Sequence, residues 1–423
     1  MKKSYYNFLF EEENDKSILY NSRTGGVAKL DAEHTKQFVN WSEEELEDKA
    51  PEFAKALYEN GFAVADGVSE LDMIRYDMLQ ARFGNQSLSL TLAITKDCNF
   101  GCKYCYEKGV LDESYLNEET KDAIVKYVEE HVVMGGSLHI TWYGGEPLLD
   151  MASITSLTNA FLEICEKKSI EYSASIITNG YLLSKEVAKT LVECKVKQIQ
   201  VTLDGDETTH NKRRPMKNGE PSYQVIWDNI LGLTEIRESL KIALRVNVDK
   251  ENVNALYDVK SRILDYNMQD FIHVYPGKVL AVEGCYNNDA CYSNKEFALL
   301  EQEYNCDTIE DGMEQIPKPQ CVVCTADNAR AMVIDCKGDM YKCYMHIGNK
   351  SRCIGNVVGD KFYHEEELYK FLLSDVTKDK NCSTCKYLPI CMGGCPNEHL
   401  YRGKSCTTYK YTLDKYIKHC IKK

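Results

Sequence analysis

The chain has 423 residues, of which 43% are hydrophobic and 27% charged, a composition typical of a globular protein with room for two or three domains. Its net charge of −14 argues against a general nucleic-acid-binding surface. The sequence shows neither a signal sequence at its start nor an apolar run long enough to cross a membrane. We therefore expect a cytoplasmic protein without membrane or nucleic-acid partners.

The cysteine content is the unusual feature of the composition, with 19 cysteines in the chain. Because nothing indicates secretion, metal binding explains them better than a disulfide framework does. A cytosolic protein rich in iron–sulfur ligands would also indicate a cell or niche that is low in oxygen.

Residues 1–85 are predicted to form a small α+β module with three strands and two amphipathic helices. Such a module looks like a winged helix, which in many peptide-modifying enzymes binds the leader segment of a precursor as an added strand. The alternative is a packing appendage of the next domain. The predicted elements are strands at 5–12, 17–21 and 27–30, one further strand at 62–64, helices at 32–41 and 43–60, and a helical linker at 66–86.

Residues 86–280 alternate strand-like and helix-like segments in a regular order. Six consecutive strand–helix units predict an α/β fold with a parallel sheet curled into a partial (β/α)6 TIM-type barrel. In such folds the reactive groups gather at the C-terminal ends of the strands. The predicted strands are 88–95, 137–143, 171–178, 198–203, 241–248 and 271–275, and the predicted helices are 118–133, 154–167, 185–194, 223–240 and 255–267.

Three cysteines follow the first of these strands at C-x₃-C-x₂-C spacing, namely Cys98, Cys102 and Cys105. Thiolates are suited to iron–sulfur clusters or zinc, and three of them can hold three irons of a four-iron cluster while the fourth iron stays open. Core cysteines or an incomplete zinc knuckle are the alternatives. With Tyr104 and Tyr106 around the last cysteine, this run resembles the signature of radical SAM enzymes.

Polar motifs at the later strand ends resemble the surface on which radical SAM enzymes bind S-adenosylmethionine (SAM). The run Gly144-Gly145-Glu146-Pro147 matches the motif that holds the methionine amino group in that family. The alternative for each motif by itself is a tight turn or a network of buried polar groups that hydrogen-bond to one another. The resemblance implies cofactor contacts at Gly144, Gly145, Glu146, Thr178, Asn179, Thr202, Asp204, Arg214 and Asn247.

The C-terminal cysteines, in residues 321–423, resemble the SPASM extension of radical SAM enzymes, which carries two auxiliary four-iron clusters. A zinc ribbon is the alternative for any single pair. The resemblance implies that one cluster is held by Cys382, Cys385, Cys391 and Cys406, and the other by Cys324, Cys343 and Cys395. Cys321 is the expected fourth ligand of the latter, with Cys306 and Cys336 as alternatives.

The other cysteines have no predicted ligand role. Cys165 and Cys194 lie on predicted helices and are expected in the core. Residues 281–320 form a bridge between the barrel and the SPASM-like domain, and Cys285 and Cys291 lie within it. Cys353 and Cys420 remain unassigned.

The resemblance implies an oxidoreductase with three [4Fe–4S] clusters and SAM. The cluster on Cys98, Cys102 and Cys105 would receive an electron from a flavodoxin- or ferredoxin-type reductant. These three cysteines are therefore predicted to be catalytic. Reductive cleavage of SAM would then give a 5′-deoxyadenosyl radical that abstracts a substrate hydrogen. Fully ligated auxiliary clusters would carry away the second electron.

The leading functional interpretation is a maturase that forms an intramolecular crosslink, such as a Cys thioether, in a ribosomally made precursor peptide with a leader. Sactipeptide and ranthipeptide synthases are enzymes of this kind. The nearest rival is an anaerobic sulfatase-maturating enzyme, which makes formylglycine. That family has an aspartate directly after the cysteine that aligns with Cys343, whereas Tyr344 stands here. A non-catalytic electron-transfer protein with several clusters is the third interpretation.

Overall fold

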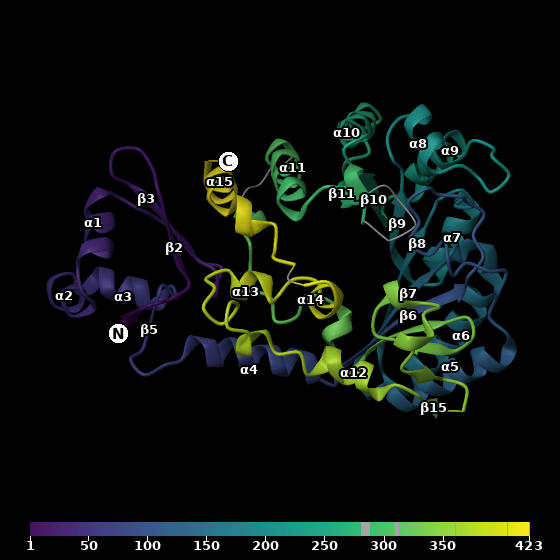
Figure 1. The fold of residues 1–423 in the computed structure, drawn as a ribbon, viewed down its shortest axis with the longest axis horizontal. Coiled ribbons are helices and arrows are strands. Elements are labelled where there is room, and N and C mark those ends of the chain that lie inside the picture. The colour runs from purple at the N-terminus through teal and green to yellow at the C-terminus, as the bar shows by residue number, and fades with distance from the viewer. Residues whose placement is uncertain (281–287, 309–312, 360, 404, 423) are drawn as a thin grey trace. The chain divides into compact units, whose positions relative to one another are not determined.

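The computed structural model describes residues 1–423 except 281–287, 309–312, 360, 404 and 423 (Figure 1). The chain divides into two compact units, and the predicted domain boundaries remain predictions. Unit 1 consists of Met1–Phe83, Ser293–Asn328 and Leu373–Lys423, and unit 2 of Gly84–Tyr292 and Ala329–Leu372. No helix among the described residues combines the length and apolar character needed to span a membrane.

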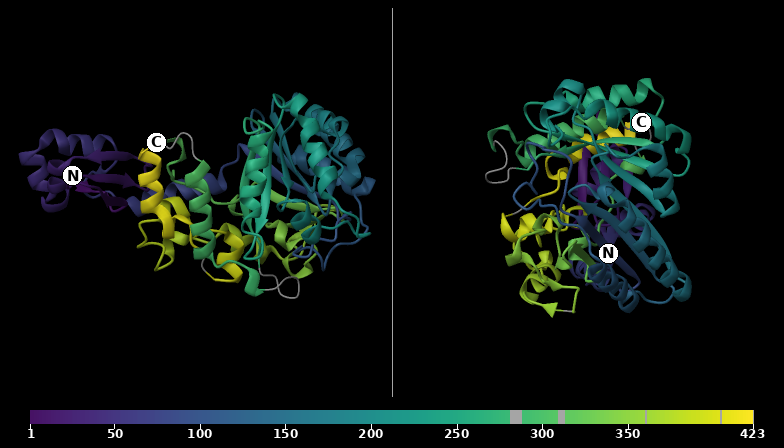
Figure 2. Two further views of the ribbon diagram at one scale, coloured as in Figure 1. Left: turned by 90° about the horizontal axis from the view of Figure 1, so that it is seen from above. Right: turned by 90° about the vertical axis from the view of Figure 1, so that its right-hand side faces the viewer.

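Unit 2 is built on a sheet whose parallel strands follow one another in chain order, which confirms the predicted α/β partial barrel (Figure 2). The strands are β6 (Ser87–Thr95), β7 (Ser137–Gly144), β8 (Glu171–Thr178), β9 (Val196–Thr202), β10 (Lys241–Val248) and β11 (Ile272–Lys278). The helices between them are α5 (Glu118–His131), α6 (Met151–Lys168), α7 (Lys185–Glu193), α8 (Glu207–Arg213), α9 (Tyr223–Gly232) and α10 (Ala255–Asp265).

The two faces of this sheet differ in polarity because side chains alternate along each strand. On β7, for example, Leu138, Ile140 and Trp142 are fully buried. The intervening His139 and Thr141 are only half-buried, and both hydrogen-bond to Ser175 on β8. One face therefore forms the hydrophobic core with the helices, and the other presents polar groups.

The sheet continues beyond β6 into strands from the C-terminal part of the chain, which were not among the predicted elements. β12 (Ala331–Asp335) pairs in parallel with β6, and β13 (Asp339–Tyr341), β14 (Gly355–Asn356) and β15 (Lys361–Phe362) extend it antiparallel. The short helix α12 (Glu365–Leu372) completes unit 2.

The N-terminal part of unit 1 contains an antiparallel sheet in the order β2 (Asn7–Glu11), β3 (Ser17–Asn21), β4 (Val27–Leu30). A second pair joins β1 (Lys2–Lys3) to β5 (Ala63–Val64). The helices are α1 (Ala32–Asn40), α2 (Glu43–Lys49), α3 (Pro51–Glu59) and α4 (Glu70–Phe83), followed later in the chain by α11 (Asn294–Thr308), α13 (Leu388–Cys391), α14 (Pro396–Tyr401) and α15 (Tyr409–Lys422).

Two predicted helices are shorter than expected. The single helix at 43–60 is wrong, because Pro51 has no N–H to continue the first helix and restricts Ala50, so α2 ends and α3 starts there. The helix at 223–240 ends at Gly232, where the chain passes into a 3₁₀ turn over Leu233–Ile236. Glycine is a poor residue for a helix interior, which favours an end at this point.

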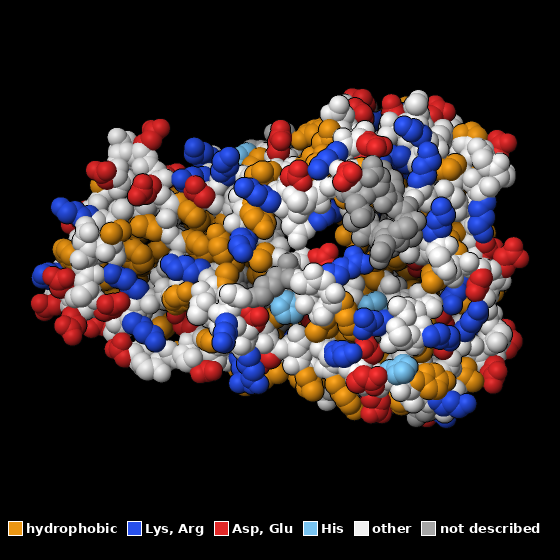
Figure 3. Space-filling model, viewed as in Figure 1, with side chains coloured by type: hydrophobic (Ala, Val, Ile, Leu, Met, Phe, Trp, Pro, Cys, Tyr) orange, Lys and Arg blue, Asp and Glu red, His pale blue; other side chains and the backbone are white. Residues whose placement is uncertain are grey.

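The N-terminal sheet shares a hydrophobic core with the C-terminal helix of the same unit. Ile18 and Tyr20 on β3 pack with Leu413 and Ile417 on α15. The Tyr20 hydroxyl also donates a hydrogen bond of 2.7 Å to the carbonyl oxygen of Pro317. Hydrophobic side chains gather visibly over this part of unit 1 in Figure 3. The sheet is therefore stabilised by residues almost 400 positions away in the sequence.

Candidate active site

The cysteine loop after β6 is fastened to the segment that follows α8. The backbone N–H of Gly101 donates to the carbonyl of Pro215 at 2.8 Å, and that of Lys103 to Arg213 at 3.0 Å. Within the loop, the N–H of Phe100 points at the Cys98 sulfur at 3.4 Å. These contacts hold the three thiols near one another without any bond between them, since all cysteines of the described chain are free.

Burial keeps the thiols of this loop protonated in the metal-free chain. It raises the pKa of Cys98 to about 12 and that of Cys105 to about 11, and the charge of Cys102 adds to both. Burial raises the pKa of Cys102 as well. Since a thiolate is the metal-ligating form, a bound metal must supply the positive charge that displaces these protons. Three convergent thiols with that requirement fit an iron–sulfur cluster.

The end of β7 brings a carboxylate to the loop. The side chain of Glu146 is completely buried and accepts three hydrogen bonds, from the Thr178 hydroxyl at 2.7 Å, the Asn179 N–H at 2.7 Å and the Leu148 N–H at 2.9 Å. Burial nevertheless raises its pKa. The structure thus brings together three of the predicted cofactor residues, which lie on two strand ends.

The two glycines before Glu146 are required by the backbone itself, whereas their predicted contact with a ligand stays a prediction. A Cβ on Gly144 would lie 2.3 Å from the Thr95 carbonyl oxygen, and one on Gly145 would lie 2.3 Å from that of Asp97. Because the two glycines have no side chains, the N–H of Gly145 can donate to the Thr95 carbonyl oxygen at 3.0 Å. The N–H of Glu146 donates to the Asp97 carbonyl oxygen at 2.8 Å. The glycines let the backbone at the end of β7 contact the cysteine loop itself.

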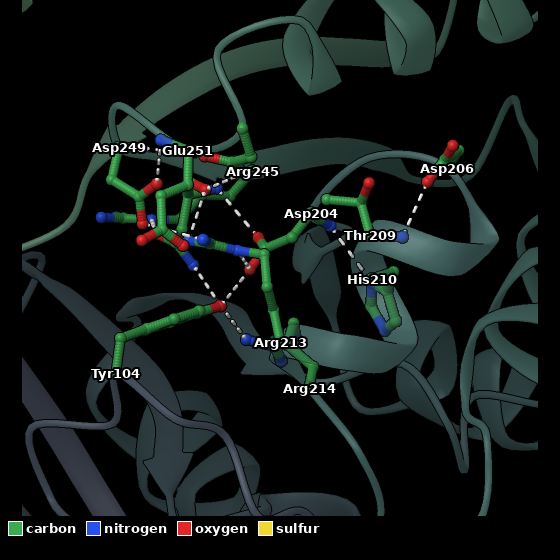
Figure 4. A network of polar contacts seen from close by, with 12 residues as sticks. Tyr104, Asp204, Asp206, Thr209, His210, Arg213, Arg214, Arg245, Asp249 and Glu251 are labelled. Carbon is green, nitrogen blue, oxygen red and sulfur yellow. Dashed lines mark hydrogen bonds and ion pairs between the residues drawn. The ribbon is translucent and has the colours of Figure 1, made fainter. Parts of the chain in front are cut away.

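A buried polar network at the ends of β9 and β10 contains three of the four remaining predicted residues, Asp204, Arg214 and Asn247 (Figure 4). The Tyr104 hydroxyl donates to Asp204 and accepts from Arg214 at 2.8 Å and from the Asn247 amide at 3.0 Å. The backbone N–H of Asn247 in turn donates to Asp204 at 3.0 Å. Thr202, the last residue of β9, is buried beside them.

Arg213 and Arg214 have different partners in this network. Arg213 pairs with Asp249 at 2.8 Å and with Asp204 at 3.4 Å, which neutralises it. Arg214 is fully buried; burial opposes its charge, but Cys102, Tyr104 and Asp204 raise its pKa well above the usual range. Among the described residues its Nε has no hydrogen-bond partner. Arg214 therefore offers a cation, with a donor still available, next to the cysteine loop.

Tyr104 was not predicted as a cofactor-site residue, although its place inside the cysteine motif could have indicated it. The polar residues at 210–214 and Asp249, by contrast, belong to the set of strand-end residues that resembles the SAM-binding surface. His210 has a structural role: its Nδ1 accepts from the Asp204 N–H at 3.1 Å and its Nε2 lies 3.1 Å from the Ser222 hydroxyl. Burial and two nearby arginines lower its pKa well below the usual range, so it stays neutral.

In unit 1 the cysteines predicted for one auxiliary cluster interact with one another. Cys391 is influenced by the charges of Cys406 and Cys385, and the Lys410 ammonium lies 3.4 Å from the Cys406 sulfur. Cys382, the fourth member, lies in the same turn as Cys385, whose backbone N–H donates to the Cys382 carbonyl at 3.0 Å. The common environment of these thiols fits the predicted cluster, whose presence stays a prediction.

The other predicted auxiliary set is divided between the units. Cys321, Cys324 and Cys395 belong to unit 1, where the charge of Cys324 influences Cys395, and Cys343 belongs to unit 2. Of the alternative ligands, Cys306 interacts with the buried Cys420, and Cys336 is buried at the end of β12. Cys285 lies outside the described residues. Within the described part of the chain, no three His, Cys, Asp or Glu side chains are placed to hold a single metal ion.

Comparison with known proteins identifies the domain. Residues 92–258 match the Radical SAM superfamily. The cyclopropyl synthase TigE, a radical SAM protein of Paramaledivibacter caminithermalis, is 23% identical over 263 residues, which cover 53% of this chain and 54% of TigE. The chain spans about half the length of the curated relatives it matches.

Two solved structures share the fold. The structure of anSMEcpe with bound AdoMet has a TM-score of 0.60 at 18% identity, covering 79% of this chain and 97% of its own. SuiB of Streptococcus suis, bound to S-adenosylmethionine, has a TM-score of 0.53 at 19% identity, covering 94% of this chain and 96% of its own. The match to SuiB extends over regions outside the barrel.

The glycine at the end of β7 gives a first prediction. Gly145→Ala should place a methyl group against the Asp97 carbonyl, push the cysteine loop away from Glu146, and lower both iron content and SAM affinity. Iron assay and equilibrium dialysis of the reconstituted protein measure the two effects. Gly109→Ala is the matched control, because nothing lies within 4 Å of its added Cβ. Equal behaviour of the two variants would contradict the proposed close approach.

Glu107 gives a prediction of pH dependence in the metal-free protein. Burial raises its pKa to about 8 from a usual 4.5, although Tyr143 and Lys96 oppose the shift. Between those values the folded chain holds a proton that the unfolded chain has lost. The free energy of unfolding should therefore fall as pH rises from about 4.5 to about 8, by an amount on the order of a few kcal/mol.

Denaturant unfolding across that pH range, on wild type and Glu107→Gln, measures the effect. Glutamine cannot titrate, so the variant should gain stability relative to wild type as pH rises. The exposed Glu113→Gln is the control and should follow the wild-type curve. A Glu107→Gln curve parallel to wild type would show that this carboxyl does not carry the dependence.

Proposed function

We propose, from the radical SAM domain formed by residues 92–258, that the protein is a peptide maturase that cleaves SAM reductively and forms an intramolecular Cys thioether in a ribosomally made precursor. The observation that carries the first half is the convergence of the three thiols, Glu146 and Arg214 at one end of the sheet. When bound, the cluster and SAM would supply an electron and a 5′-deoxyadenosyl radical.

The residues of the chain would position the cluster and SAM relative to each other. Cys98, Cys102 and Cys105 would hold the cluster, and Glu146 would accept hydrogen bonds from the SAM amino group near it. Arg214 offers a buried cation for the SAM carboxylate, and its free Nε is a donor for one carboxylate oxygen. Tyr104 fixes the Arg214 guanidinium by a hydrogen bond of 2.8 Å, so the cation is oriented before the ligand arrives.

The peptide substrate is supported by the fold shared with SuiB and anSMEcpe, both of which have been solved with a bound peptide. Thioether formation from a thiol and a C–H bond removes two hydrogen atoms. One of them would leave with 5′-deoxyadenosine, and the other leaves as a proton and an electron that needs an acceptor. Two auxiliary clusters on the C-terminal cysteines, making three [4Fe–4S] clusters in all, would accept that electron.

Formylglycine formation is the second candidate, because a cysteine-type anaerobic sulfatase-maturating enzyme of Clostridium novyi aligns over 73% of this chain at 22% identity. The residue after Cys343 is Tyr344, and its ring lies 5.7 Å from that of Tyr143 and 6.4 Å from that of Tyr106. A phenol is protonated at neutral pH and is therefore a weaker proton acceptor than a carboxylate, which favours the crosslinking reaction.

The first test separates a SAM-cleaving enzyme from a passive electron carrier. With all three cysteines of the loop changed, Cys98→Ala, Cys102→Ala and Cys105→Ala, the reconstituted protein should form no 5′-deoxyadenosine under dithionite yet retain about eight irons. Chromatography and iron assay give the two values. Cys165→Ala, on the buried face of α6, is the control and should keep the wild-type 5′-deoxyadenosine formation and the wild-type iron content. Iron near zero in the triple variant would contradict separate auxiliary clusters.

The second test identifies the product. We expect a short Cys-containing peptide encoded beside the gene, co-expressed with this protein, to lose the mass of one H₂ and to resist alkylation at one cysteine. Mass spectrometry with and without iodoacetamide distinguishes the outcomes. Loss of the cysteine sulfur with formation of an aldehyde would support the sulfatase-maturating reaction instead, and an unchanged peptide would contradict both.

A further inference from the structure

Arg245 lies on the polar face of the sheet in unit 2, one step from the SAM-site network. It is in register with Thr202 on β9 and with Tyr275 on β11, so these three residues form a row across adjacent parallel strands. Its neighbours Leu244 and Val246 are fully buried on the other face. The Arg245 side chain is half-buried and therefore remains accessible to a ligand on the polar face.

The surrounding residues hold this guanidinium in place. Its Nε donates to the Asn247 side-chain oxygen at 2.7 Å. Gly277, the next residue of β11 on the same face, leaves room for it, because a Cβ there would lie 2.3 Å from Nε and 2.7 Å from Cζ of Arg245. Beside it, the Tyr275 hydroxyl donates to Gln200 at 2.7 Å. The Nε of this arginine is thus held by a neutral group, and Figure 4 labels Arg245 in the same network as Asp204, Arg213 and Asp249.

No carboxylate in the described part of the chain forms an ion pair within 4.0 Å of the Arg245 guanidinium, whereas Arg213 in the same network has two. A cation that is partly desolvated without a counterion costs free energy, and a bound anion recovers it. The planar fork of an arginine matches the two oxygens of a carboxylate. Such a site is therefore incomplete until a carboxylate arrives.

We propose that Arg245 binds a carboxylate of the peptide substrate and so fixes the substrate against the polar face of the sheet. The proposal rests on the proposed function. SAM also carries a carboxylate, but Arg214 already lies beside the cysteine loop to receive it, and the Asn247 side chain separates the two arginines. Arg245 is then a specificity-determining residue: a peptide that offers an acidic side chain at the right distance binds, and its amide analogue binds poorly.

The test measures the accessibility of this arginine directly in the reconstituted enzyme with phenylglyoxal, which modifies unpaired guanidinium groups. Peptide mapping by mass spectrometry gives the modification rate of Arg245. The probes are two acetylated, C-terminally amidated hexapeptides that differ only by Glu or Gln at one central position. A third probe carries Gln and a free C-terminal carboxylate. Arg237, half-exposed and paired with Asp270, is the internal control.

We expect the Glu peptide at millimolar concentration to slow modification of Arg245 about threefold or more, and the Gln peptide to have no effect. Protection by the third probe alone would assign the site to a peptide C-terminus, which is still a substrate carboxylate. Protection by SAM alone would place Arg245 in the SAM site and overturn the proposal. Equal protection by the Glu and Gln peptides, or none by any peptide, would also overturn it.

A pair of variants extends the test to turnover of the co-expressed peptide. Arg245→Gln should raise the KM for the peptide about tenfold and change the SAM dissociation constant much less, whereas Arg237→Gln should change neither. A rise in the SAM dissociation constant as large as the rise in KM would contradict the assignment. Footprinting needs no turnover, so an enzyme that fails to cleave SAM would sink the proposed function while leaving the carboxylate site measurable.

Discussion

The close approach of two strand ends is the constraint on which the site depends. β6 and β7 are adjacent parallel strands, and the backbone after β7 touches the backbone after β6 because Gly144 and Gly145 have no side chains. This contact joins the cysteine loop to the carboxylate of Glu146. A metal-ligating loop is otherwise an irregular segment with few internal contacts, so its geometry is set by this contact and by its hydrogen bonds to residues 213–217.

The second constraint is the compensation of buried charge. Asp204, Asp249 and Arg213 are buried, and each is paired within the same network. Removing one member would leave the others uncompensated, which is far more costly than the net contribution of the pair. Arg214 and Arg245 are not paired with a carboxylate in this way. The Asn247 side chain lies between them, because it accepts from Arg245 and donates to Tyr104, which in turn binds Arg214. The network thus pairs Arg213 with two carboxylates, whereas Arg214 and Arg245 are the two cations to which we assign anionic ligands.

The sequence was sufficient for the order of the elements and much of the site. Six buried strands separated by amphipathic helices could form few other folds, and motifs at strand ends had to meet at one edge of the sheet. The partners of Arg213 and Arg245 could not be predicted, because they follow from registers between β9, β10 and β11. Nor did periodicity reveal that residues 331–335 join the sheet beside β6, since a short apolar run has no preferred neighbour.

The raised pKa values of Cys98, Cys102 and Cys105 lower the reactivity of these thiols in the iron-free protein. Oxidation and disulfide exchange proceed through the thiolate, and these thiols stay protonated at neutral pH. The three thiols of the newly made loop therefore react slowly with oxidants and disulfides. They bind metal only when a cation displaces their protons. Assembly of the cofactor is thus a competition between iron and hydrogen ions, which acid conditions would tilt against the holoenzyme.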